Sequence, residues 1–114
     1  MNTFENLQVW QKSKILYVKV FTTFKNCKEY YFKDQICRAS LSIVNNIAEG
    51  YERQTSKELR QFLFIAKGSS GEVRSMLLIA IELYLVPEEK GNQLVAKANE
   101  ISKMLSGFIK SLNT

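Results

Sequence analysis

The sequence of 114 residues contains no histidine, and this absence excludes several classes of catalytic site. There can be no Ser-His-Asp triad, no Cys-His protease pair and no imidazole acid or base, and nearly all zinc sites are excluded as well. Proline occurs once and glycine five times. So few turn-forming residues argue against a β-sandwich and favour long helices.

Cysteines and long hydrophobic runs are also scarce. Cys27 and Cys37 stand apart with no CxxC pattern, so we expect partly buried thiols and neither a disulfide framework nor a catalytic centre. The most apolar run, Met76–Val86, is interrupted by Glu82 and is shorter than the roughly 20 residues that span a bilayer. The start of the chain lacks a signal-peptide pattern, and we expect a cytoplasmic protein.

The residues that are present fit one globular domain over positions 1–114. Hydrophobic residues make up 46% of the chain and charged residues 24%, the balance of an ordinary folded domain. The formal net charge is +5. Such a basic excess is compatible with a nucleic acid or an acidic protein as partner.

Apolar residues recur at spacings of three and four in four segments, which is the pattern of amphipathic helices. The predicted helices cover about Phe4–Lys25, about Lys33–Glu52, a long segment from Thr55 to the Val86-Pro87 step, and Pro87 to about Leu112. The connections between them are short. The sequence therefore predicts an all-α fold, an antiparallel up-down-up-down four-helix bundle.

The third predicted helix begins with a capping box formed by Thr55 and Glu58. The small residues Gly68-Ser69-Ser70-Gly71 could form a loop that splits this helix in two. The apolar period continues in phase across them, which a loop would normally destroy. We therefore predict one continuous helix, with the split helix as the alternative.

The same helix is apolar around its whole circumference in two places, Phe62–Ala66 and Met76–Ile81. A helix in an isolated bundle buries one face and exposes the other to water. We therefore predict a homo-oligomer whose interface includes Phe64, Ile65 and Leu78. The alternative is that these residues are surface apolar residues without a partner, which are common.

Neither a metal centre nor a cofactor site is predicted. The carboxylates that could bind a metal in a bundle have basic neighbours, and the histidines of di-metal bundles are missing; they are Glu49, Glu52, Glu58 and Glu72. There is no glycine-rich phosphate loop after a strand. We expect no cofactor, no catalytic residue and no enzymatic activity.

Basic residues form lines along the predicted helices, and such lines are either solvated edges or phosphate contacts. Lys12 with Lys19, and Lys90 with Lys97, form lines on the first and last helices. The candidate nucleic-acid residues surround the start of the third helix; they are Arg38, Arg53, Lys57, Arg60 and Lys67. The alternative for Arg38 and Arg53 is a structural ion pair with Glu49 or Glu52.

A polar cluster interrupts the apolar pattern of the second helix. It consists of Ser42, Asn45, Asn46 and Glu49. Because asparagine is a poor helix-interior residue, its presence indicates a buried hydrogen-bond network that fixes the register between helices or subunits.

At these residues the sequence resembles a known family. The resemblance is carried by RASLSIVNNIAEGYER (Arg38–Arg53), by SKELRQFLFIAKGSSGEV (Ser56–Val73) and by the opening Phe4, Leu7, Val9 and Trp10. It covers nearly the whole chain. These segments resemble the bacterial four-helix-bundle proteins encoded by intervening sequences in 23S rRNA genes, whose superfamily includes the accessory protein of diversity-generating retroelements. Two departures are Glu29–Phe32, where the family often has Pro and Gly-Leu, and Ser13, where it tends to have Ala.

The resemblance implies an up-down bundle that assembles into a pentameric barrel. It implies association with nucleic acid through the retroelement relatives, which work with a reverse transcriptase and its template RNA. We therefore expect a non-enzymatic oligomer that binds RNA or DNA through backbone phosphates. The alternatives are a protein-interaction scaffold and a reverse-transcriptase accessory protein.

Overall fold

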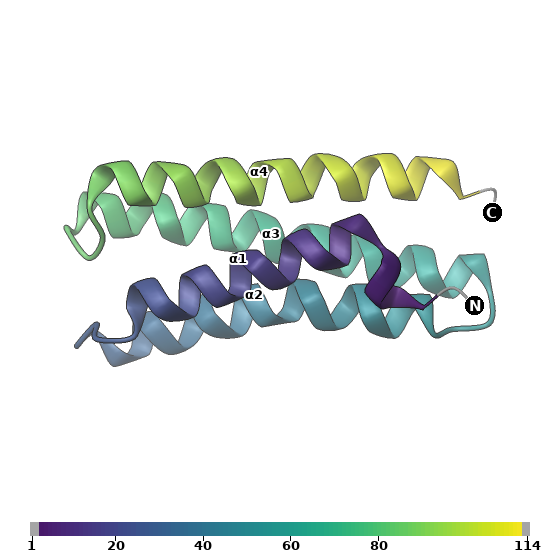
Figure 1. Cartoon of the computed structure of the whole chain (residues 1–114), viewed down its shortest axis with the longest axis horizontal. Helices are drawn as coiled ribbons and strands as arrows, with labels where there is room; N and C mark the ends of the chain where they lie inside the picture. Colours follow the sequence, from purple (N-terminus) through teal and green to yellow (C-terminus); the bar gives the residue numbers. More distant parts are fainter. Residues whose placement is uncertain (1–2, 113–114) are drawn as a thin grey trace.

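The computed structural model describes residues 3–112, and in this range the chain forms four long helices and no strand. A single 3-10 turn, η1, precedes them. The elements are η1 Phe4–Asn6, α1 Gln8–Phe24, α2 Tyr30–Tyr51, α3 Ser56–Glu82 and α4 Glu88–Ser111 (Figure 1). The predicted all-α fold is confirmed.

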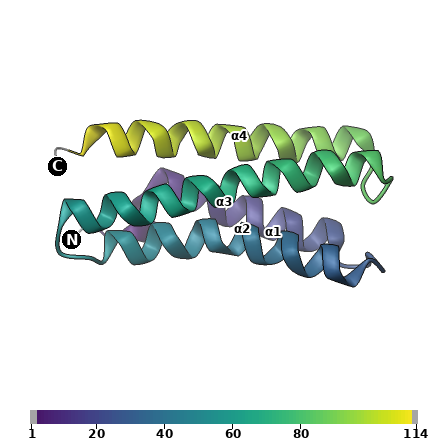
Figure 2. The same ribbon diagram turned by 180° about the vertical axis from the view of Figure 1, so that it is seen from behind.

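The helices form an elongated bundle of 43 × 21 × 19 Å in which each runs opposite to the one before it (Figures 1 and 2). Helix α1 packs against α2 and α4, and α3 packs against the same two helices. Within the described residues α1 and α3 make no contact, so they occupy diagonal corners of the bundle and run in the same direction. Their outer sides consequently face away from each other.

One continuous core runs along the bundle axis. The residues that recur at spacings of three and four along α2 are fully buried; they are Ile36, Ser40, Ile43 and Ile47. The other helices contribute buried residues at the same three-and-four spacing; they include Leu16, Val20 and Phe24 of α1, Leu63, Val73 and Leu77 of α3, and Leu94, Ile101 and Leu105 of α4. The periodicity therefore identified the inward faces correctly.

Helix α3 is continuous through Gly68-Ser69-Ser70-Gly71, as predicted. Its first turn is capped by Thr55, whose Oγ1 accepts a hydrogen bond from the backbone N–H of Glu58 at 3.1 Å. The Glu58 carboxylate accepts the Thr55 hydroxyl at 3.0 Å and does not reach back to the Thr55 backbone. The predicted capping box is therefore formed in its N-cap half only.

Three predicted boundaries were wrong by a few residues. Helix α1 begins at Gln8 because Leu7 is extended after the 3-10 turn. Helix α2 begins at Tyr30, three positions before the predicted Lys33. The side chains of Tyr30 and Tyr31 are exposed, so within this first turn only Phe32 packs against the core and no apolar period marks the start of the helix.

The third boundary is the end of α3, which closes at Glu82 before the proline. Tyr84 then adopts a left-handed conformation with φ of 58°. The N–H of Tyr84 donates to the carbonyl of Ile81, and the N–H of Leu85 donates to that of Ala80. This is the Schellman pattern, which satisfies the last carbonyls of a helix and is usually built on glycine. Tyrosine in this position does not predict the end of a helix, so this boundary could not be located from the sequence.

Two glycines allow close approach between helices. A Cβ on Gly50 would lie 2.7 Å from the Cβ of Phe62, and a Cβ on Gly91 would lie 2.5 Å from Ile81. Gly50 lies within α2 at a negative φ, so no left-handed turn requires a glycine there. Its role is to let α2 and α3 approach each other at the corner that carries the basic residues.

Candidate nucleic-acid interface

Arg53 lies just after α2, at the corner where α2 turns into α3. Its guanidinium pairs with Glu49 at 3.3 Å and with Glu58 at 3.7 Å, and it lies 4.9 Å from the ring centre of Phe62. The predicted alternative, an ion pair with Glu49, is therefore formed. Two carboxylates therefore neutralise the Arg53 guanidinium, and its main role is to stabilise the turn between α2 and α3.

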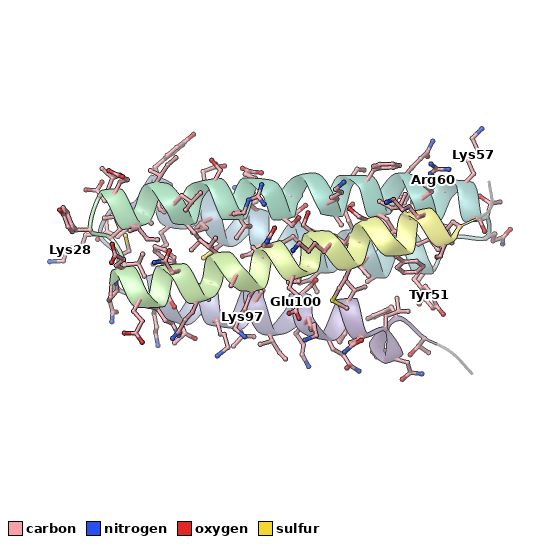
Figure 3. All side chains as sticks on the ribbon, turned by 90° about the horizontal axis from the view of Figure 1, so that it is seen from above. Lys28, Tyr51, Lys57, Arg60, Lys97 and Glu100 are labelled. Atoms are coloured by element: carbon pink, nitrogen blue, oxygen red, sulfur yellow. The ribbon has the colours of Figure 1, made fainter. Side chains whose placement is uncertain are left out.

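Lys57 and Arg60 project from the first turns of α3. Figure 3 places both side chains at one end of the bundle, with Lys28 at the other end. Lys57 is exposed, and within residues 3–112 its side chain makes no ion pair. The Arg60 guanidinium lies 5.7 Å from the ring centre of Phe64. Lys57 is thus the more available phosphate contact of the two.

The other two candidates lie farther from this corner. Lys67 is half-buried, two turns along α3 from Arg60. Arg38 is exposed on α2, about 22 Å along the helix axis from Arg53. The structure therefore brings Arg53, Lys57 and Arg60 together and leaves Arg38 outside that group.

A second basic region lies in the groove between α1 and α4. Lys12 of α1 pairs with Glu100 of α4 at 3.4 Å. Lys19 and Lys97 line the same open groove beside Glu100, and Figure 3 shows Lys97 and Glu100 projecting from neighbouring turns of α4. Three lysines therefore share a single carboxylate, which leaves this groove with local positive charge.

The lysine lines of the first and last helices were predicted separately and not as one site. Lys12 and Lys97 are 85 positions apart in the chain, and only the pairing of α1 with α4 brings them to one groove. The signal that could have found them is the predicted topology itself. In an up-down bundle the first and last helices are neighbours.

The predicted polar cluster forms a network at two of its four residues. Asn46 Nδ2 donates to the backbone carbonyl of Ser42 at 2.8 Å and to its hydroxyl at 3.0 Å, and that hydroxyl lies 3.0 Å from the hydroxyl of Ser69. This network ties α2 to α3, as expected of a register device. Asn45 and Glu49 are exposed, so the prediction was wrong for them.

The cysteines and carboxylates form no reactive centre in the part of the chain that the structure describes. Cys27 and Cys37 are free thiols, each half-buried. Burial raises the pKa of the Cys37 thiol above its ordinary value, which suppresses the nucleophilic thiolate. Among residues 3–112 no group of three carboxylates or thiols is arranged to hold a metal ion.

The predicted interface residues of α3 lie on its outer side. Phe64 is 49% exposed, Ile65 51% and Leu78 49%. Ile79 shares this face at 47%. The chain itself therefore leaves the outer side of α3 uncovered, which is the condition that the predicted interface requires.

Comparison with known proteins identifies the family. Residues 5–107 match the family described as 23S rRNA-intervening sequence protein. A crystal structure of a protein of unknown function from the S23 ribosomal protein family of Bacteroides thetaiotaomicron superposes with a TM-score of 0.86 at 27% identity, covering 90% of this chain and 99% of that one. No curated protein matches the chain.

Within residues 3–112 no helix combines the length and the apolar character that crossing a bilayer requires.

The family match extends over more than half of the chain, through α1, α2, α3 and most of α4. On that match, the chain belongs to the 23S rRNA-intervening sequence protein family.

Proposed function

We propose that this protein is a non-enzymatic, cytoplasmic homo-oligomer that associates with RNA through backbone phosphates. The carrying observation is the groove between α1 and α4, where Lys12, Lys19 and Lys97 surround the single carboxylate Glu100. The corner with Lys57 and Arg60 supplies a second basic patch. The family description names 23S rRNA, which supports RNA as the nucleic acid.

The mechanism is electrostatic. Lysine and arginine side chains neutralise phosphates and release condensed counterions, which gives affinity without reading base sequence. One bundle offers only a few such contacts. A homo-oligomer repeats the two patches in every subunit, and multivalent contact raises the overall affinity without new chemistry. Assembly, for which a pentamer is the expected form, is therefore part of the proposed function.

Fluorescence anisotropy with a structured RNA hairpin tests the proposal. Binding should fall linearly in a log–log plot as salt is raised from about 50 to 200 mM. Replacement of Lys19 and Lys97 by Ala, and separately of Lys57 and Arg60 by Ala, should weaken binding to unrelated hairpins equally and flatten the salt slope.

The matched control is the double variant Lys28→Ala with Lys103→Ala, which removes two exposed charges outside both patches. It should bind nearly as well as the original protein. No measurable affinity for the hairpin near 50 mM salt would contradict the RNA proposal, and so would an equal loss in the control.

A second candidate function, a protein-interaction scaffold, is favoured by the exposed apolar residues of α3. Affinity capture separates the two candidates. A stoichiometric protein partner that stays bound after nuclease treatment, together with absence of RNA affinity, would favour the scaffold.

A further inference from the structure

A second uncovered apolar face lies on α1. Ile15 is 46% exposed, Val18 54% and Phe21 48%, and they follow one another at a spacing of three, so they lie on the side of α1 away from the core. We call these three residues the α1 face. We call Phe64, Ile65, Leu78 and Ile79 the α3 face. Two such faces on one small chain require a common explanation.

The two faces lie on opposite sides of the bundle. Helices α1 and α3 sit at diagonal corners, and both run in the same direction (Figures 1 and 2). A two-fold pairing of identical faces would use only one of them and leave the other exposed to water. A head-to-tail contact, in which the α1 face of one copy meets the α3 face of the next, buries the α1 face and the part of the α3 face opposite it in every interior copy.

Charges beside the two faces have opposite signs and similar spacing. On α1, the exposed Lys14 and Lys25 flank the α1 face and are about 16 Å apart along the axis. On α3, the exposed Glu72 and Glu82 flank Leu78 and Ile79 and are about 15 Å apart. Among the described residues neither glutamate makes an ion pair, so both carboxylates are available to a neighbouring copy.

The heights of these charges along the bundle differ by about one helical turn. Lys12 of α1 pairs with Glu100, and Arg74 of α3 donates to Asn99 at 3.0 Å. Both helices are thereby tied to adjacent residues of α4. Lys14 lies two positions after its anchor and Glu72 two positions before its own, so the two residues differ in height by about 5 Å, which is about one helical turn. A copy rotated about an axis parallel to the bundle therefore brings Lys14 towards Glu72 with an offset that their long side chains can span.

No contact within the chain requires glycine at two positions of α3. A Cβ on Gly68 or on Gly71 would meet no atom within 4 Å, yet glycine inside a helix costs about 1 kcal/mol relative to alanine. Both lie between the two apolar pairs of the α3 face. They leave a shallow gap in which a neighbouring helix could approach the α3 backbone.

We propose that the α1 face of one copy packs on the α3 face of the next copy, with Lys14 and Lys25 opposite Glu72 and Glu82. This heterologous contact rests on the homo-oligomer of the proposed function and specifies its two surfaces. It generates a ring when the rotation between copies closes. The α1–α4 groove lies beside the α1 face, so each junction repeats the lysines of that groove at a fixed interval.

Charge reversal tests the pairing by sedimentation velocity of the full chain at micromolar concentration. The variant K14E/K25E places glutamates opposite glutamates, and the variant E72K/E82K places lysines opposite lysines. Each should weaken self-association at least about 100-fold, because like charges across an interface cost several kcal/mol. The fourfold variant K14E/K25E/E72K/E82K restores opposite charges and should assemble again.

The control K28E/K103E makes the same change of net charge as K14E/K25E, at exposed positions outside both faces. It should assemble as the original chain does. If the original chain assembles and the reversals have no effect, or if the fourfold variant stays dissociated while retaining its helical circular dichroism, the proposed pairing is wrong and the oligomer uses other surfaces. If the original chain is a monomer of about 13 kDa, both the oligomer of the proposed function and this pairing are wrong.

Discussion

The outer sides of α1 and α3 differ from that of α4, although all four helices contribute to the same core. The outer side of α4 carries polar and small residues such as Asn92, Gln93 and Lys103, and among its described residues no large apolar side chain is exposed. The α1 and α3 faces carry seven large apolar residues that are about half exposed. The core explains the inward pattern of every helix, whereas the proposed contact between copies would account for the outward difference.

The largest expected effect is the loss of assembly on placing a charge in the α3 face. Phe64→Glu should dissociate the oligomer while the helical circular dichroism persists, because a charge buried at an interface without a partner is costly. Leu41→Glu is the matched control, since Leu41 is an aliphatic residue of α2 that is 37% exposed. If light scattering finds that Phe64→Glu still assembles, or that the control dissociates, the interface is not specific to the outer side of α3.

The two sides of α3 should also differ in their effect on folding. Leu63 is fully buried, so Leu63→Ala should lower the free energy of unfolding by about 2–5 kcal/mol. Ile79→Ala, on the outer side of the same helix, should change it by less than about 1 kcal/mol. Both are measured by urea unfolding in the Phe64→Glu background, where assembly does not contribute. Equal losses would mean that the outer side of α3 is packed within the monomer.

Glycines on the inner and outer sides should respond to alanine with opposite signs. Gly50→Ala forces a Cβ to within 2.7 Å of Phe62 and should destabilise the bundle by about 1–3 kcal/mol. Gly68→Ala meets open space and should stabilise the Phe64→Glu monomer by about 0.4–1 kcal/mol. In the original chain Gly68→Ala should weaken assembly. A stabilised monomer with unchanged assembly would show that no neighbouring helix approaches this glycine.

The inward-facing side of α1 contains the reverse anomaly, a buried hydroxyl. Ser13 is fully buried, and within the described residues its Oγ has no hydrogen-bond partner. Ser13→Ala should therefore raise the free energy of unfolding by about 1 kcal/mol. Val18→Ser, on the outer side of α1, should leave the monomer nearly unchanged and weaken assembly. A loss of stability in Ser13→Ala, measured by thermal and urea unfolding, would show that the hydroxyl has a partner after all.

The core-facing residues of the helices could be predicted from the sequence, because burial on one side of a helix makes apolar residues recur at spacings of three and four. The stripes of α2 and α4 and the unbroken α3 followed from that period alone. The α3 face was detected because its residues form consecutive runs with core positions. The residues of the α1 face alternate with core residues and lysines, so Ile15, Val18 and Phe21 look like part of one broad stripe until the orientation of the helix is known.

The charged sites were predicted only in part, for a different reason. Lys57 and Arg60 are close in the sequence and stay close in the fold. The groove of Lys12, Lys19 and Lys97 depends on the pairing of the first helix with the last, which no local pattern encodes. Arg53 was placed correctly but is largely engaged by Glu49 and Glu58, because the turn into α3 brings both carboxylates to it.

The most direct test of the contact between α1 and α3 is disulfide formation between two single-cysteine proteins. In a background with Cys27→Ser and Cys37→Ser, one protein carries Val18→Cys and the other carries Ser75→Cys, at exposed positions of α1 and α3. After mixing and mild oxidation, the mixture should give cross-linked dimers on non-reducing gels, whereas each protein alone should give few. Efficient cross-linking of either protein alone, with none specific to the mixture, would contradict the head-to-tail contact between α1 and α3.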